Sequence, residues 1–397
     1  MYNNGMTYQQ IADEMGIAWT TVKNHIYNAR AAAKEADPES DVDEIVAAEK
    51  ARQQRQHEER IVRKLLKDKA RTDILCDILR DAVAAYKPLE LPDEGYESGP
   101  GMPEQAVLLI SDCQIGQETR AEETGGLGEY NLDVFRTRAR ALTDSVREIT
   151  RIHRRAYPVD KLSVFFLGDI VEGETIFAGQ KDHIDADAVE QMLAASDTFA
   201  NMLLELSADY PTIECVCVGG NHGRTGKKGE GKTWTNWDYV AYKYMQQRLS
   251  QNTDRIRVHV PKTWWALVNV MGWDFLIQHG DQIRGWGGFP YYGMARAGGL
   301  WSQLLQTQGQ TWDYFVIGHH HTRVELDSTA GEMIANGSWP GGSHFSLKQL
   351  NVANKPAQLF FGVNERHGIT WRYKLGLGYD EEVRRAKLQS EDCDTAG

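Results

Sequence analysis

Residues 162–173 of this 397-residue chain read Leu-Ser-Val-Phe-Phe-Leu-Gly-Asp-Ile-Val-Glu-Gly. A short uncharged run rich in aromatic and branched side chains, ended by glycine, predicts a strand buried on both faces. The run stops at Leu167, and Gly168 and Asp169 follow directly. The segment therefore predicts a core strand that places a carboxylate at its carboxyl end.

The same arrangement recurs along residues 104–378, where apolar runs end in glycine and polar side chains. Further apolar runs span residues 106–111, 213–218, 267–277 and 314–317, and helical patterns span 131–153 and 186–206. The polar residues that follow the runs are Asp112, Gln114, Asn221, His222, His279, His319 and His321. Strands alternating with helices predict an α/β domain. Because ligands bind outside the carboxyl ends of its strands, we expect these side chains to converge on one crevice.

The converging set contains carboxylate, amide and imidazole donors and no thiolate. Such donors suit hard or borderline divalent cations, namely Mn²⁺, Mg²⁺, Fe²⁺ or Zn²⁺. The set is too large for one cation and about sufficient for two. Two cations ~3.5–4 Å apart stabilise the attacking and leaving oxygens of a displacement at phosphorus. The donor set therefore predicts a dinuclear site for phosphoester chemistry.

The motif order resembles that of the calcineurin-like metallophosphoesterases, which is Asp-x-His, Gly-Asp, Gly-Asn-His, His, Gly-His-x-His. Here the motifs read Asp112-x-Gln114, Gly168-Asp169, Gly220-Asn221-His222, His279 and Gly318-His319-x-His321. The resemblance covers roughly residues 106–325 and implies a four-layer αββα sandwich. It implies that one cation binds Asp112, Gln114, Asp169 and His321, and that the other binds Asp169, Asn221, His279 and His319.

The resemblance also implies the roles in catalysis. Asp169 would bridge two cations, most readily Mn²⁺, and a hydroxide between the cations would attack phosphorus. His222 would stabilise the phosphate and protonate the leaving oxygen. Gln114 stands where the family has histidine, and a neutral amide there favours a weaker site or one that prefers Mn²⁺ or Mg²⁺. Gly223 stands where an acid often follows the triplet, which leaves the orientation of His222 open.

Residues 1–34 resemble the helix-turn-helix core of sigma-factor and response-regulator DNA-binding domains. Helices are predicted over residues 8–15 and 18–33, with Gly16 between them. The polar side chains suited to phosphates and base edges are Thr20, Thr21, Lys23, Asn24 and Arg30. The alternative is a helical hairpin used only for packing.

Residues 35–103 predict a charged helical strut that ends in a linker rich in proline and glycine. Residues 52–71 carry eight basic and three acidic side chains, and an apolar stripe follows at Ile74, Leu75, Ile78, Leu79 and Val83. The stripe fits either a coiled-coil homodimer or packing on the next domain. The metallophosphoesterase domain then spans residues 104–378, and a flexible acidic tail spans 379–397.

DNA is the substrate that the sequence favours. The nearest resemblance is to SbcD-type DNA exonucleases and related phage-encoded phosphoesterases. The loop after His222 adds Arg224, Lys227, Lys228 and Lys232, which suit a polyphosphate backbone. One alternative is a phosphatase or phosphodiesterase for small nucleotides or phosphoproteins. Another is a DNA-binding assembly protein with a vestigial metal site.

The composition limits how the chain can bind its partners. With 44 Lys and Arg against 56 Asp and Glu, the net charge is −12, so nucleic acid must bind through local patches or bound cations. The five cysteines form no Cys-x-x-Cys pair, which is typical of a reducing compartment. With no signal peptide and no long apolar run, we expect a cytoplasmic protein, in the host cytoplasm if phage-encoded. The sequence does not identify an ATPase partner.

Overall fold

A computed structural model describes residues 5–33, 41–84, 99–126, 128–176, 179–226, 228–229, 231–284, 289–341 and 355–377. The chain divides into two units, Met1–Tyr86 and Lys87–Gly397, which are described separately. The domain boundaries expected after residues 34, 103 and 378 stay a prediction, and the tail 379–397 lies outside the described residues. Among the described helices, none combines the length and apolar character needed to cross a membrane.

The first unit begins with two short helices, α1 (Tyr8–Met15) and α2 (Trp19–Ala33). Thr7 caps α1 in a capping box with Gln10, and Gly16 ends it in the left-handed conformation with φ of 63°. Ile11, Ala12 and Val22 form a small shared core. Both predicted helices are therefore confirmed, along with the glycine that separates them.

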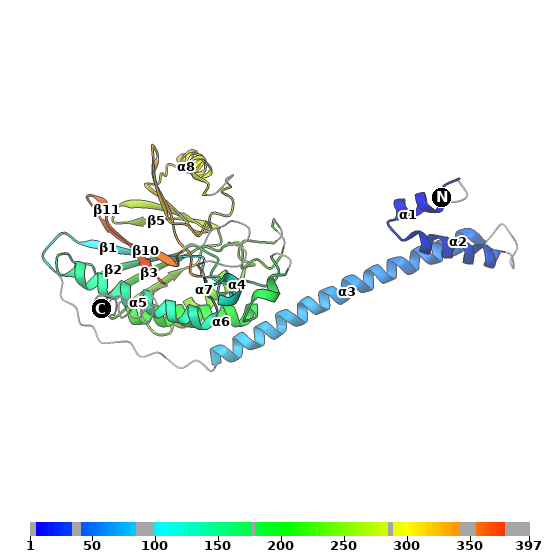
Figure 1. Cartoon of the computed structure of the whole chain (residues 1–397), viewed down its shortest axis with the longest axis horizontal. Coiled ribbons are helices and arrows are strands. Elements are labelled where there is room, and N and C mark those ends of the chain that lie inside the picture. The colour runs from blue at the N-terminus through cyan, green and yellow to red at the C-terminus, as the bar shows by residue number, and fades with distance from the viewer. Residues whose placement is uncertain are drawn as a thin grey trace, which may run out of the picture. The chain divides into compact units, whose positions relative to one another are not determined.

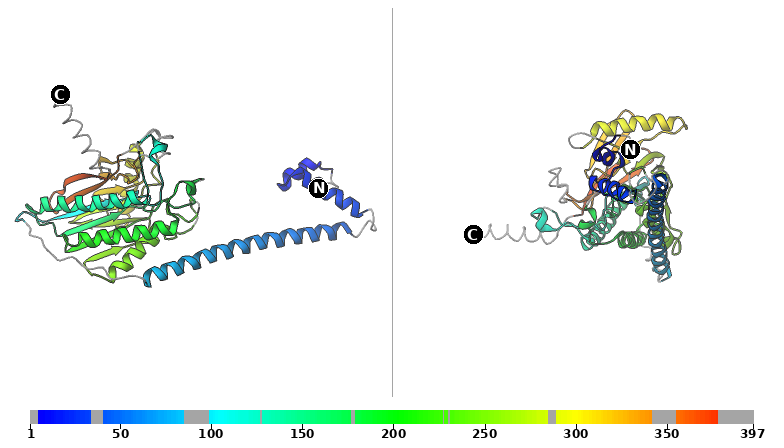
Figure 2. Two further views of the ribbon diagram at one scale, coloured as in Figure 1. Left: turned by 60° about the horizontal axis from the view of Figure 1, so that its bottom comes forward. Right: turned by 90° about the vertical axis from the view of Figure 1, so that its right-hand side faces the viewer.

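The third helix, α3 (Asp41–Ala84), is a single uninterrupted element of 44 residues (Figure 2). Its described side chains are mostly exposed, including Ile74 and Ile78 of the predicted apolar stripe. The side chains of Leu75, Leu79 and Val83 lie outside the described part of the chain. The helix predicted within residues 35–103 is therefore present as α3, while its role as a strut and the homodimer seam stay predictions.

The second unit contains a six-stranded sheet in the order β11-β10-β1-β2-β3-β4. Its parallel strands are β1 (Glu104–Ile110), β2 (Lys161–Phe166), β3 (Thr212–Cys217) and β4 (Ile256–His259). Two antiparallel strands, β10 (Ala357–Asn364) and β11 (Gly368–Gly376), complete one side. All seven residues of β1 are buried, as continuous apolar runs predict for strands covered on both faces.

A second sheet has the order β5-β6-β7-β9-β8. Its strands are β5 (Trp265–Val270), β6 (Trp273–Gln278), β7 (Tyr314–Ile317), β8 (Val324–Ser328) and β9 (Gly331–Ala335). The expectation that the apolar run over residues 267–277 forms one strand is wrong, because β5 and β6 form an antiparallel hairpin there. Met271 and Gly272 make its turn with φ of 54° and 90°, the geometry of a tight two-residue hairpin loop.

The two sheets pack face to face and helices cover their outer faces. One core cluster joins Val107, Phe165 and Val216 of the first sheet to Phe275 and Val316 of the second. Helices α5 (Leu132–Arg154), α6 (Ala188–Leu206) and α7 (Trp237–Ser250) cover the first sheet, and α8 (Tyr291–Gln306) covers the second (Figures 1 and 2). Two short helices, α4 (Ala121–Thr124) and η2 (Gln180–His183), lie in the connections. The predicted αββα sandwich is confirmed.

Candidate metal centre

The strands of both sheets deliver the candidate ligands at their carboxyl ends. Asp112, Asp169 and Asn221 follow β1, β2 and β3, while His279 and His319 follow β6 and β7. Hydrogen bonds join the loops across the two sheets, because the His319 N–H donates to both carboxylate oxygens of Asp112 at 2.9 and 3.0 Å. The face-to-face packing therefore gathers residues that lie up to 209 positions apart.

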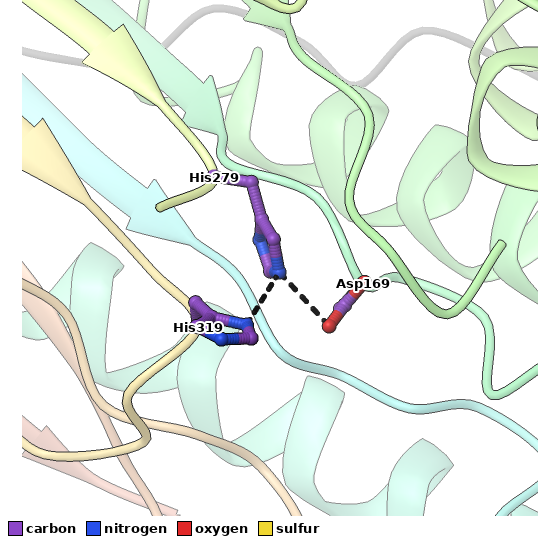
Figure 3. Close-up of side chains that lie close together, drawn as sticks. All are labelled: Asp169, His279 and His319. Carbon is purple, nitrogen blue, oxygen red and sulfur yellow. Dashed lines mark hydrogen bonds and ion pairs between the residues drawn. The ribbon is translucent and has the colours of Figure 1, made fainter. Parts of the chain in front are cut away.

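The first group of ligands surrounds the Nε2 atom of His279. Asp169 Oδ2 lies 2.9 Å from this nitrogen, Asn221 Oδ1 lies 3.2 Å away and His319 Nδ1 lies 3.2 Å away. The other ring nitrogen, Nδ1, donates to the Leu167 carbonyl at 2.8 Å. Figure 3 shows the two imidazoles and the carboxylate turned toward one another. The candidate ligand atoms of Asp169, His279 and His319 all lie within 4.8 Å of one another.

This arrangement fits a bound cation, because acceptor atoms converge on one point. With its proton on Nδ1, neutral His279 presents a lone pair at Nε2, beside a carboxylate oxygen, an amide oxygen and a second imidazole. A proton on Nε2 would serve one acceptor, whereas a metal ion binds all four. Asp169 Oδ2 is buried against His279 Nε2, away from solvent. Donation of the remote ring N–H to a backbone carbonyl is typical of metal-binding histidine.

The second group of ligands contains Asp112, Gln114 and His321. His321 Nε2 lies 3.4 Å from Asp112 Oδ1 and 3.2 Å from the amide nitrogen of Gln114. The structure thus brings together all seven residues that the sequence proposes as ligands, in two groups joined through Asp112 and His319. The second group holds one charged oxygen and one imidazole, so its donors are weaker than those around His279.

Backbone strain concentrates at the same positions. Among the described residues, six non-glycine residues have positive φ, and five of them are candidate ligands: Asp112, Gln114, Asp169, His319 and His321. A left-handed conformation costs a non-glycine residue about 1–3 kcal/mol and persists only where its surroundings impose it. Such strain clusters at functional sites, which makes this distribution independent support for the site.

Two glycines allow the ligands to approach the neighbouring backbone. A Cβ atom at Gly220 would lie 2.1 Å from Asp169 Oδ1, and one at Gly318 would lie 2.7 Å from Asp112 Oδ2. Any side chain at either position would displace a carboxylate. These glycines therefore belong to the construction of the site.

The charges in the site follow from burial and from the partners. Burial opposes ionisation of Asp169, but the imidazoles of His279 and His222 hold its pKa well below the ordinary value. Burial also opposes protonation of His279, yet Asp169 raises the pKa of His279 to about 9. For His319, burial and the charge of His279 lower the pKa to about 3. Without a metal ion, His279 is therefore protonated at neutral pH and His319 is neutral.

A cation that binds this group must displace the proton of His279. We expect about one proton to be released per first cation bound at pH 7, and the apparent affinity to rise about tenfold per pH unit up to pH 9. Above that pH, His279 is already neutral and the dependence ends. Calorimetry in buffers of different ionisation enthalpy measures the release. His279→Asn should abolish it, and an affinity independent of pH would contradict the assignment.

Glu172 is a functional candidate that the sequence analysis did not identify. Its Oε2 lies 3.0 Å from His222 Nδ1, and the His222 backbone N–H donates to Asp169 Oδ1 at 2.7 Å. Burial opposes the imidazolium, but Glu172 and Asp169 together raise the pKa of His222 to about 10. Glu172 thus provides the acid that is missing at Gly223. Its signal was the spacing Gly-Asp-x-x-Glu after β2.

Asp238 is a second residue that the sequence analysis missed. This buried carboxylate in the first turn of α7 accepts four backbone N–H groups, from Asp169, Ile170, Val171 and Gly220, at 2.8–3.1 Å. Burial raises the pKa of Asp238 to about 6. Asp238 therefore fixes the two loops that carry Asp169 and Asn221. An acidic residue in the first turn of a helix gives no sequence signal for this role.

Replacing Asp238 with asparagine should loosen both loops. An amide has one acceptor oxygen, so two of the four N–H groups would face an NH₂ group. We expect Asp238→Asn to lower the free energy of unfolding by about 2–3 kcal/mol and to weaken cation binding. Chemical denaturation and metal titration measure the two effects. Asp133→Asn, in the exposed first turn of α5, is the matched control. Equal stability of both variants would remove Asp238 from this role.

The remaining candidates lie on loops and on α2. Arg224 donates from Nε to the Asn221 carbonyl at 2.9 Å, and Lys228 pairs with Asp281 at 3.2 Å. Lys232 lies beside Trp234, and Lys227 lies outside the described residues. On α2, the side chains of Thr21, Lys23 and Asn24 are exposed. The ring of His320 packs against Phe289 rather than joining the ligands.

Comparison with known proteins gives one family match and several structural likenesses. Residues 1–32 match the family model described as sigma-70, region 4, which confirms the helix-turn-helix-like character of this segment. No curated protein matches the sequence. The nearer resemblance to SbcD-type exonucleases stays a prediction.

Similar solved structures include vacuolar protein sorting 29 from Cryptosporidium parvum, with 12% identity and a TM-score of 0.30 over 66% of this chain and 86% of that one. The zinc complex of the Entamoeba histolytica protein has 10% identity and a TM-score of 0.30, over 68% of this chain and 99% of that one. A predicted phosphoesterase from Streptococcus pneumoniae has 10% identity and a TM-score of 0.27, over 69% of this chain and 99% of that one. An archaeal phosphodiesterase has 11% identity and a TM-score of 0.27, over 68% of this chain and 99% of that one.

Proposed function

We propose that this protein is a metal-dependent phosphodiesterase that hydrolyses DNA. The observation that carries the proposal is the convergence of four acceptor atoms at His279 Nε2, beside a second group built on Asp112. Asp169, Asn221, His279 and His319 would hold one divalent cation. Asp112, Gln114 and His321, with Asp169, would hold the other.

Divalent cations, when bound, supply Lewis-acid activation of water and neutralise charge on the phosphate. The chain's own contribution is to position the acid. Glu172 holds Nδ1 of His222, which leaves Nε2 for the substrate, and Nε2 lies 4.0 Å from Asp169 Oδ2. The protonated His222 can bind a phosphate oxygen and then give its proton to the leaving oxygen.

Two features support DNA as the substrate. The family match and the exposed polar face of α2 suit contacts to phosphates and base edges. In addition, the loop that follows His222 in the chain carries Arg224, Lys228 and Lys232, and Arg224 donates to the carbonyl of the candidate ligand Asn221. Basic side chains in that position suit a substrate with several phosphates.

The second candidate function, hydrolysis of small nucleotides, uses the same metal chemistry. In that case the N-terminal unit, whose core contains Ile11, Ala12 and Val22, would serve assembly alone. The third candidate, a DNA-binding assembly protein with a vestigial site, would lose nothing when Asp169 is replaced.

Digestion of end-labelled DNA separates these candidates. Single- and double-stranded DNA would be incubated with Mn²⁺, Mg²⁺ or chelator, and mononucleotides would be tested in parallel. The proposal predicts metal-dependent shortening of DNA that chelator abolishes. If the protein hydrolyses bis-p-nitrophenyl phosphate but leaves DNA uncut, the nuclease assignment is rejected and the phosphodiesterase assignment is retained. If the protein hydrolyses neither DNA nor bis-p-nitrophenyl phosphate, both assignments are rejected.

A further inference from the structure

Two lysines and one tryptophan form a cluster that joins the loop after His222 to the connection between β4 and β5. The ammonium of Lys232 lies 5.3 Å from the ring centroid of Trp234, and that of Lys262, from the connection between β4 and β5, lies 5.2 Å from it. Both lysines are exposed and Trp234 is half-buried. In the part of the chain that the structure describes, neither lysine forms an ion pair with an acid. Two like charges thus share one ring in a chain of net charge −12.

Hydrogen bonds connect this cluster to the metal centre. The loop closes through an antiparallel bridge between Arg224 and Asn236, and the Thr225 hydroxyl donates to the Thr235 carbonyl at 3.1 Å. Asn236 Nδ2 donates to the Gly220 carbonyl at 2.8 Å, next to the ligand Asn221. Trp234 precedes Asn236 by two residues, so their Cα atoms are at most about 7 Å apart. The indole therefore lies close enough for one polynucleotide to reach both places.

We propose that Lys232, Trp234 and Lys262 form a subsite for single-stranded DNA, in which a base stacks on the indole and the two ammonium groups bind backbone phosphates. This inference rests on the proposed function, because the strand in the subsite continues to the metal centre. A mononucleotide cannot occupy both places. The subsite therefore gives polynucleotides an advantage over small nucleotides.

The magnitudes favour a bound strand over the lysine contacts of the free protein. A lysine over an exposed aromatic ring gains less free energy than one base gains by stacking on an aromatic side chain. A strand can therefore displace an ammonium group from the ring, and the ammonium gains a phosphate partner. A duplex keeps its bases stacked inside, so it cannot use the indole.

Binding measured in chelator tests the subsite without catalysis. The anisotropy of a fluorescent oligothymidylate would be followed at several salt concentrations. We expect Trp234→Ala to weaken binding by about tenfold without changing the salt dependence. The double variant Lys232→Ala, Lys262→Ala should reduce the slope of log K against log salt by about 1.4, the value for two single-strand phosphates. A duplex should bind equally to wild type and Trp234→Ala.

Lys243→Ala is the matched control. The ammonium of Lys243 lies 5.9 Å from the ring centroid of Tyr239 on α7, so this substitution also removes a lysine charge from an aromatic ring. We expect it to change binding less than twofold. If Trp234→Ala proves unstable in thermal unfolding, Trp234→Phe and the lysine double variant carry the test. Unchanged affinity and slope in these variants, or equal losses for duplex and single strand, would overturn the subsite.

Hydrolysis of bis-p-nitrophenyl phosphate with Mn²⁺, measured in parallel, separates the two proposals. This substrate has no polynucleotide backbone that could bridge the two places, so any loss of its hydrolysis in Trp234→Ala should be smaller than the loss of oligothymidylate binding. Inactivity of the wild type with every cation would reject the proposed function, while the binding experiment would still decide whether the cluster holds DNA.

Discussion

Asp169→Asn should reduce kcat/KM for bis-p-nitrophenyl phosphate by a factor of about 10³ or more, because the carboxylate is expected to hold both cations and metal ions supply several kcal/mol of stabilisation. The substitution keeps the size of the side chain and removes its charge. The bound metal, measured by mass spectrometry after dialysis, should fall with the activity.

The control for this result is another buried carboxylate outside the site. Asp209, which pairs with Arg147 and Arg151 at the start of β3, lies at the opposite end of the strands. Asp209→Asn should affect stability while the metal content and kcat stay at wild-type values. Full activity and full metal content in Asp169→Asn would contradict the assignment and favour a vestigial site.

His222→Asn should leave the metal content unchanged and lower kcat by a factor of about 10²–10⁴, the usual contribution of a positioned acid. The loss should depend on the leaving group. The p-nitrophenolate ion departs without a proton, whereas the alkoxide of a dinucleotide needs one. We therefore expect a larger loss on the dinucleotide than on bis-p-nitrophenyl phosphate.

The exposed His259 on β4 supplies the control, since His259→Asn removes an imidazole that is not among the candidate ligands. Equal losses of His222→Asn on the two substrates would mean that His222 only binds the phosphate. A drop in metal content would instead make His222 part of the metal centre.

The sequence predicted the parts of the fold that continuous apolar runs mark. Strands β1, β2, β3 and β7 lie where those runs predict them, because strands buried on both faces carry almost no polar residues. The hairpin of β5 and β6 escaped prediction because Met271 lies in its turn and continues the apolar pattern. Strand β8 has an alternating burial pattern and polar residues, so no run marks it.

The candidate ligands were predictable because each lies within four residues of a strand end, whereas the residues that hold them were not. Glu172 contacts His222 from a position 50 residues away, and Asp238 contacts Asp169 across 69 residues. Those contacts depend on how loops pack at the sheet edge, and residue spacing alone does not determine them. The cluster around Trp234 has the same origin, since Lys262 reaches it from another loop.

Anomalous diffraction from a crystal grown with Mn²⁺ tests the central claim most directly. A single measurement shows whether a cation occupies the point where Asp169, Asn221, His279 and His319 converge. We predict a strong manganese peak there, within coordination distance of His279 Nε2 and Asp169 Oδ2, and a weaker peak between Asp112 and His321. Absence of both peaks, with a protonated His279 hydrogen-bonded to Asp169 instead, would contradict the account.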